Sequence, residues 1–216
     1  MEMISIMQDA TSATDERKTC LLIVGRTASG KDTLASAVHD RYGLTFVKSY
    51  TTRPKRYAGE DTHVFVTPDE AKPLLKDAVA YTKIGEYEYF ATKQQVLASD
   101  GYIIDPRGVS ELCKNMPETR FAIAYVRAAV TRRREAAMSR GDEETEDAAF
   151  VARERSEDAE FTRFEHALDM YADGDHAALP PNVTQACVIR NRYDKASLED
   201  GMAMIAYMSV RHRRTK

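Results

Sequence analysis

The chain has 216 residues, of which 43% are apolar, and it carries a formal net charge of −3. This length and apolar content suffice for one sizeable core, whereas the acidic balance argues against a general nucleic-acid-binding protein. No stretch approaches the ~20 apolar residues of a membrane-spanning helix, and residues 1–17 do not follow the pattern of a signal peptide. The three cysteines are scattered without paired spacing, which is typical of reduced thiols. We therefore expect a soluble, cytoplasmic protein.

A glycine-containing loop follows the first predicted strand. Residues 1–17 are polar and are expected to form a flexible N-terminal arm, and the continuous apolar run at 19–24 predicts a strand buried on both faces. Apolar residues then recur at helical spacing up to Gly43, which fits the end of a helix. A strand, a glycine loop, a lysine and a helix in this order indicate a phosphate-binding loop. The predicted ATP-binding residues of this loop are Gly25, Arg26, Thr27, Ala28, Ser29, Gly30, Lys31, Asp32 and Thr33.

The loop contains the residue types that binding of a nucleotide phosphate requires. Gly25 and Gly30 allow backbone N–H groups to point at phosphate oxygens. Lys31 adds a full positive charge to the partial charge of the helix N-terminus, so we predict that it is catalytic. Asp32 stands where a hydroxyl usually ligates Mg²⁺, and Thr33 follows it; Asp32 could hold the metal directly or through water, or cap the helix instead. We predict ATP and Mg²⁺ as cofactors, with Asp32 and Thr33 as candidate metal ligands.

The remaining elements alternate around a segment of different character. After a second strand at 44–48, short strands are predicted at 64–66, 79–84 and 87–91, with a helix at 68–76 between them. Further strands are predicted at 102–104, 121–126 and 186–189, and helices at 109–115, 128–141, 143–170 and 198–210. This order predicts an α/β fold: a parallel sheet with right-handed crossovers and the phosphate site at the carboxyl ends of its strands.

The polar stretch at 49–56, Ser-Tyr-Thr-Thr-Arg-Pro-Lys-Arg, and the Gly-Glu pair at 59–60 resemble the acceptor site of the guanylate kinase family. The resemblance continues at 89–92, 105–108, 140–141, 152–153 and 191. It spans about residues 18–205, with an unmatched stretch at 169–185. It implies a P-loop kinase domain over 18–216, with a core at 18–48 and 93–216, an inserted acceptor-binding lobe at 49–92 and a helical lid at about 139–155. It implies acceptor contacts from Ser49, Arg53, Arg56, Glu60, Tyr89, Thr92 and Asp105, catalytic lid arginines at Arg140 and Arg153, and an ATP contact from Asn191.

The two arginines of this stretch indicate phosphate binding from their chemistry alone, independently of the family resemblance. A nucleoside monophosphate presents a dianionic phosphate, and Arg53 and Arg56, three positions apart, could clamp it with forked hydrogen bonds. A solvated basic loop is the alternative. Tyr89 and Thr92 would add neutral donors, as the resemblance implies, although plain packing also accounts for a tyrosine.

Several positions depart from the family pattern. Val79 stands where the family has its base-reading glutamate, and Ile103 replaces a second acidic residue, while Ser49 is retained. His63 replaces a tyrosine, and Phe90 replaces another that would offer a hydroxyl to the phosphate. In the lid, the first arginine of the family aligns with Met138, and Arg134 could take its place.

The resemblance implies ATP-dependent phosphoryl transfer to a nucleoside monophosphate, with GMP or dGMP as the favoured acceptor. Ribose 1,5-bisphosphate phosphokinases are an alternative, because they are similar at 30–33 and 60–63 and need no base-reading glutamate. A non-catalytic guanylate-kinase-like binding module is a second alternative, although such modules lose the loop lysine that this chain keeps as Lys31. We expect small-molecule substrates, no nucleic acid, no membrane partner, and a monomer or homodimer.

Overall fold

The computed structural model describes residues 19–139 and 143–210. Its centre is a four-stranded sheet in the order β6-β1-β7-β8, in which every adjacent pair of strands is parallel. The two inner strands are continuous apolar runs because both of their faces are covered. The strands are β1 (Thr19–Val24), β6 (Gly101–Ile103), β7 (Arg120–Arg127) and β8 (Val183–Arg190).

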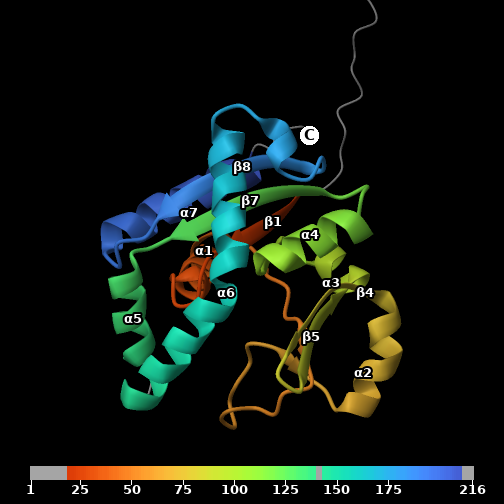
Figure 1. The fold of residues 1–216 in the computed structure, drawn as a ribbon. Coiled ribbons are helices and arrows are strands. Elements are labelled where there is room, and N and C mark those ends of the chain that lie inside the picture. Colours follow the sequence, from red (N-terminus) through yellow and green to blue (C-terminus); the bar gives the residue numbers. More distant parts are fainter. Residues whose placement is uncertain (1–18, 140–142, 211–216) are drawn as a thin grey trace, which may run out of the picture.

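Helices cover both faces of this sheet (Figure 1). Alternate residues of β1 and β7 enter two separate apolar clusters, one shared with α4 and α6 and the other with α1 and α7. The sheet is therefore sandwiched between two helical layers, which confirms the predicted α/β class with a parallel sheet. The helices are α1 (Lys31–Tyr42), α4 (Pro106–Asn115), α6 (Glu143–Ala172) and α7 (Lys195–Val210), and α5 (Val130–Met138) packs beside α6.

A second, smaller sheet forms a lobe that lies below the central sheet in Figure 1. Its strand order is β3-β2-β5-β4, with β2 and β3 parallel and the other pairs antiparallel. The hairpin between β4 and β5 turns at Gly85, whose φ of 61° favours glycine. The lobe comprises β2 (Tyr50–Thr51), β3 (Val64–Phe65), α2 (Pro68–Leu74), the 3₁₀ turn Leu75–Asp77, β4 (Ala78–Ile84) and β5 (Tyr87–Thr92).

The structure departs from the predicted elements in several places, and three of these departures have a clear physical reason. The expected strand at 44–48 is wrong: it is reduced to one bridge between Phe46 and Gly101, because it runs beside the short edge strand β6. Helix α3 (Lys93–Ala98) was not predicted, although its capping box of Thr92 and Gln95 is visible in the sequence. Helix α4 begins at Pro106 instead of residue 109, because Asp105 caps it.

Two further observations complete the fold. A 3₁₀ turn, His176–Ala178, leads from α6 toward β8. Across the part of the chain that the structure describes, none of the helices is both long enough and apolar enough to cross a membrane.

Candidate active site

The loop between β1 and α1 wraps closely on itself at the carboxyl edge of the central sheet. Ala28 and Gly30 both have left-handed backbone angles, with φ of 57° and 92°. A side chain at Gly30 would meet Nδ2 of Asn191 at 2.3 Å, and one at Gly25 would meet the carbonyl oxygen of Val126 at 2.5 Å. Both glycines are therefore required by close approach, as a phosphate-binding loop demands.

Lys31 is the first residue of α1 and lies over this loop. Its Nζ donates to the carbonyl oxygens of Gly25 at 2.6 Å and Arg26 at 3.0 Å. The lysine faces a cavity of about 180 Å³ at the edge of the sheet. Its other lining residues are Gly25, Thr27, Ile103, Ile104, Asp105, Glu157 and Phe161. The predicted loop lysine thus lies where a phosphate held by the loop would meet its charge.

Asn191 supports the loop from the end of β8. Its Nδ2 donates to the carbonyl oxygen of Ser29 at 2.9 Å, and its Oδ1 accepts from the backbone N–H of Tyr193 at 2.8 Å. The hydroxyl of Tyr193 in turn donates to the carbonyl oxygen of Ala28. Asn191 therefore orders the predicted ATP-binding loop, and Tyr193 is a supporting residue that no local sequence signal revealed.

The loop also contains an unpaired polar atom. Among the residues that the structure describes, the buried Oγ of Ser29 has no hydrogen-bond partner. Buried hydroxyls are normally paired, so an orphan inside a glycine loop fits a site for phosphate oxygens.

The two predicted metal ligands lie outside the lining of the Lys31 cavity. Asp32 and Thr33 are exposed on the first turn of α1, and neither lines the Lys31 cavity. The carboxylates that do line it belong to Asp105 and Glu157. Oxygen donors of this kind suit Mg²⁺, which is commonly held by one or two carboxylates together with substrate phosphates.

Ser49, His63 and Tyr89 meet in the small lobe. The Ser49 hydroxyl lies 2.9 Å from Nδ1 of His63, and the His63 ring meets the Tyr89 ring edge-on at 5.6 Å. Burial lowers the pKa of His63, and the neighbouring Arg53 acts in the same direction. The imidazole is therefore mostly neutral at pH 7. The structure brings the predicted Ser49 and Tyr89 together and adds His63 between them.

Arg53 is held in this lobe by Glu60. Its Nη2 donates to Oε1 of Glu60 at 2.7 Å and its Nη1 to Oε2 at 3.2 Å, while the backbone N–H of Arg56 donates to Oε2 at 2.7 Å. The Arg53 guanidinium, followed by that N–H, lowers the pKa of Glu60 to about 2. Glu60, predicted as an acceptor contact, therefore orients Arg53.

Arg53 and Arg56 still have free donors. Among the described residues, Nε of Arg53 is buried without a partner, and the exposed Arg56 side chain has no hydrogen bond or ion pair. The pKa of Arg53 is raised, first by the Glu60 carboxylate, and the Tyr89 hydroxyl contributes in the same direction. Guanidinium donors beside a tyrosine suit a phosphate ligand.

Thr92 and Asp105 both cap helices. The Thr92 hydroxyl accepts from the backbone N–H of Gln95 at the start of α3, and Thr92 lines a separate cavity of about 890 Å³. Asp105 accepts from the backbone N–H of Gly108 at 2.7 Å, and it also faces the Lys31 cavity. Thr92 therefore caps α3, and Asp105 both caps α4 and faces the Lys31 cavity.

Val79, which stands at the predicted base-reading position, is buried in the core. The side chain is 6% exposed and packs in the same apolar cluster as Leu112 and Cys113. Its carbonyl oxygen accepts from the Asn115 side chain at 3.0 Å. Val79 is therefore a core residue of the junction between the lobe and α4.

The arginines of the predicted lid are only partly accounted for. Arg140 lies outside the described residues, and Arg153 is exposed on α6. Arg134, the candidate for the role of the family's arginine that aligns with Met138, pairs with Asp147 at 2.7 Å.

The buried arginine of this region is Arg133, which donates to Glu154 at 2.8 Å and to the carbonyl oxygen of Thr27 at 3.3 Å. Sequence reasoning did not assign Arg133, because only the fold brings α5 beside the loop.

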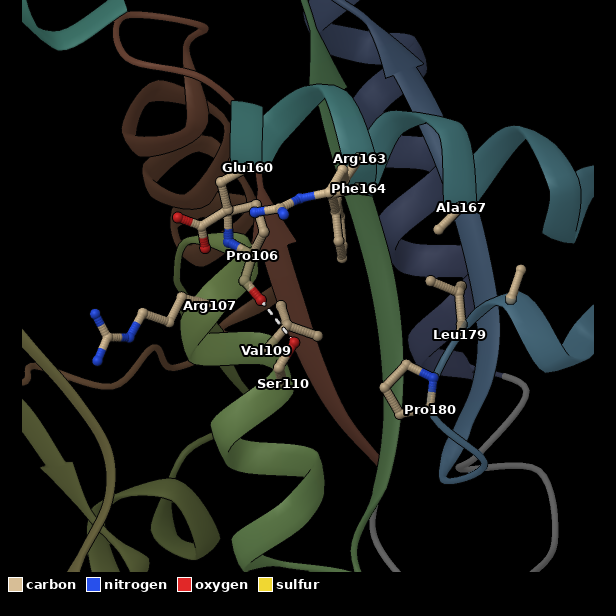
Figure 2. A pocket seen from close by; sticks show the side chains of 11 residues that line it. Pro106, Arg107, Val109, Ser110, Glu160, Arg163, Phe164, Ala167, Leu179 and Pro180 are labelled. Carbon is tan, nitrogen blue, oxygen red and sulfur yellow. Dashed lines mark hydrogen bonds between the residues drawn. The ribbon is translucent and has the colours of Figure 1, made fainter. Parts of the chain in front are cut away.

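A larger hollow of about 520 Å³ lies between α4, α6 and the segment at 178–180 (Figure 2). Its floor is apolar, and Arg107, Glu160 and Arg163 stand around it. Burial raises the pKa of Glu160, and the charge of nearby Asp105 acts in the same direction. The start of α4 separates this hollow from the Lys31 cavity, since Asp105 lines one and Pro106 the other.

Comparison with known proteins adds evidence on the fold. No protein-family model and no curated protein matches the chain. Guanylate kinase from Anaplasma phagocytophilum, a crystal structure, matches with a TM-score of 0.52 over 93% of this chain and 88% of that chain, at 14% identity. The likeness is one of fold. An uncharacterized protein from Eubacterium ventriosum ATCC 27560 matches over 89% of this chain and 98% of that chain, at 15% identity, but its TM-score of 0.40 carries no argument.

Proposed function

We propose that the chain is an ATP-dependent phosphotransferase that transfers the γ-phosphoryl group to the phosphate of a nucleoside monophosphate, with GMP or dGMP as the first candidate acceptor. One observation carries this proposal: a phosphate-type loop with Lys31 at its cavity occurs together with an Nε donor of Arg53 that has no partner among the described residues of the inserted lobe. The fold shared with a guanylate kinase supports the same reaction class.

The described residues have distinct roles in this reaction. Lys31 places its charge at the donor phosphates, and Arg53 and Arg56 hold the acceptor phosphate. No general base is required, because the acceptor phosphate is already anionic, and catalysis is then positioning plus charge neutralisation. When bound, Mg²⁺ supplies further neutralisation of the transferred group. Asp105 and Glu157 are the cavity carboxylates that would hold it, and exposed Asp32 and Thr33 are the sequence-predicted alternatives.

A second candidate acceptor is ribose 1,5-bisphosphate. It is favoured by the burial of Val79 in the core, which leaves no carboxylate at the position that reads guanine in the family. A sugar bisphosphate needs the arginine donors and does not need a base contact.

A coupled ADP-release screen tests both candidates. GMP, dGMP, AMP, CMP, UMP and ribose 1,5-bisphosphate are compared at equal concentration, with Lys31→Ala as the inactive control. We expect turnover with GMP or dGMP above the other nucleotides. Faster turnover of ribose 1,5-bisphosphate than of GMP would show that the protein is a sugar kinase and not a nucleotide kinase. ATP binding without turnover of any acceptor would favour a non-catalytic binding module.

A further inference from the structure

The side chain of Arg26 leaves the phosphate loop and binds α6. Its Nη1 donates to Asp158 at 2.9 Å, its Nε and Nη2 each donate to Glu165 at 3.3 Å, and its Nη2 also donates to Thr162 at 3.1 Å. The guanidinium lies 5.5 Å from the centre of the Phe161 ring, and only 12% of the side chain is exposed. Arg26 is thus a largely desolvated cation with two carboxylate partners on one helix.

Glu165 connects this pair to the core of the central sheet. It also accepts from the hydroxyl of Tyr125, a β7 residue that is 1% exposed. Burial raises the pKa of this hydroxyl, and Glu165 raises it further, so Tyr125 remains a donor. The loop cation, the helix carboxylate and the sheet hydroxyl therefore form one partly buried network at the edge of the core.

The next loop residue is held by the same helix. The Thr27 hydroxyl donates to the Glu157 carboxylate at 3.2 Å, and the carbonyl oxygen of Thr27 accepts from Arg133 at 3.3 Å. Two consecutive residues of the loop are therefore fixed by side chains from α5 and α6. Phosphate binding by such a loop depends on the direction of its N–H groups, and small displacements are costly to catalysis.

We propose that Arg26 is a positioning residue, which holds the first half of the phosphate loop on α6 through Asp158 and Glu165. Helix α6 also carries Arg153, so the same network fixes the loop relative to that arginine. The expected effect of Arg26 on ATP binding rests on the proposed kinase function. The positioning itself is a property of the ligand-free chain.

The test compares Arg26→Met with the matched control Arg41→Met, which removes an exposed arginine at the far end of α1. Methionine keeps an apolar stem against Phe161 and removes the cation. In the ligand-free chain, hydrogen exchange of the amides at 25–30 should be about tenfold faster in Arg26→Met and unchanged in Arg41→Met. Calorimetry should show about tenfold weaker ATP binding, and KM for the acceptor should change less than twofold.

Glu165→Gln is the second variant, and it also serves if Arg26→Met does not fold. Glutamine keeps the side-chain volume, and we expect the same faster amide exchange in the loop. Combining Glu165→Gln with Arg26→Met should increase the exchange rate little further, because the two residues act as one unit. Unchanged loop exchange in a folded Arg26→Met chain would overturn the proposal, as would equal weakening of ATP and acceptor. A wild-type chain that binds no ATP would refute the kinase function, and the exchange comparison would still decide the role of Arg26.

Discussion

Gly30→Ala combines two costs that the structure allows us to separate. Gly30 has a φ of 92°, and a left-handed angle costs an L-residue about 1–2 kcal/mol. Its new Cβ would also lie 2.3 Å from Nδ2 of Asn191 and would displace the hydrogen bond of that atom to Ser29. Loss of that bond adds about 1 kcal/mol. We therefore expect Gly30→Ala to lower the free energy of unfolding by about 2–3 kcal/mol.

Gly43→Ala is the matched control. Gly43 is also left-handed, with a φ of 68°, but an added Cβ would meet no atom within 4 Å. Only the backbone cost then applies, so Gly43→Ala should retain about 1 kcal/mol more stability than Gly30→Ala, or about 2–4 °C in Tm. Thermal and urea unfolding of both variants measure the difference. Equal destabilisation would show that Asn191 moves aside freely and that it does not fix the loop.

Three further predictions concern the site. Lys31→Ala should lower the rate of phosphoryl transfer on the order of a thousandfold with little change in Tm, because the lysine serves the ligand; steady-state assay and a thermal melt check this. Ser49→Ala should lower kcat/KM for GMP by about five- to a hundredfold and for AMP much less, whereas Arg53→Ala should lower both together. Because the pKa of His63 is lowered in the folded chain, the imidazole binds a proton more tightly in the unfolded chain. The contribution of His63 to the free energy of unfolding is therefore complete above about pH 6.5 and is lost as the pH falls below that value. His63→Gln should flatten that part of the stability profile in urea titrations.

Each of these has a clear contrary result. Near-normal turnover of folded Lys31→Ala would remove the lysine from catalysis. A neutral Ser49→Ala with every nucleotide would separate Ser49 from base recognition. An unchanged pH profile in His63→Gln would show that the imidazole titrates normally.

The phosphate loop and most elements of the core were predictable, because their signals are local. The apolar run of β1, the glycines of the loop and the following helix lie within 25 residues of one another. The capping role of Asp105 was equally local, since it precedes Pro106 at the start of α4, but the resemblance directed attention to acceptor binding instead.

The partners of the site residues could not be predicted, because they are distant in the chain. Arg26 meets Glu165 across 139 positions, and Asn191 meets Ser29 across 162. Only the order of strands in the sheet brings these residues together. The pairing of Glu60 with Arg53 is closer, but choosing between an acceptor contact and an orienting carboxylate required the observed bonds.

The support of the loop by Asn191 and Tyr193 has a consequence for synthesis of the protein. The loop emerges from the ribosome early, whereas its support follows the last strand, β8. Elongation at about 5–20 residues per second separates the two by roughly ten seconds or more. During that interval the nascent chain contains the loop sequence without the contacts of Asn191 and Tyr193. A nascent chain that stops before β8 would therefore keep the contacts of Arg26 and Thr27 with α5 and α6 and lack the support of Ala28 and Ser29.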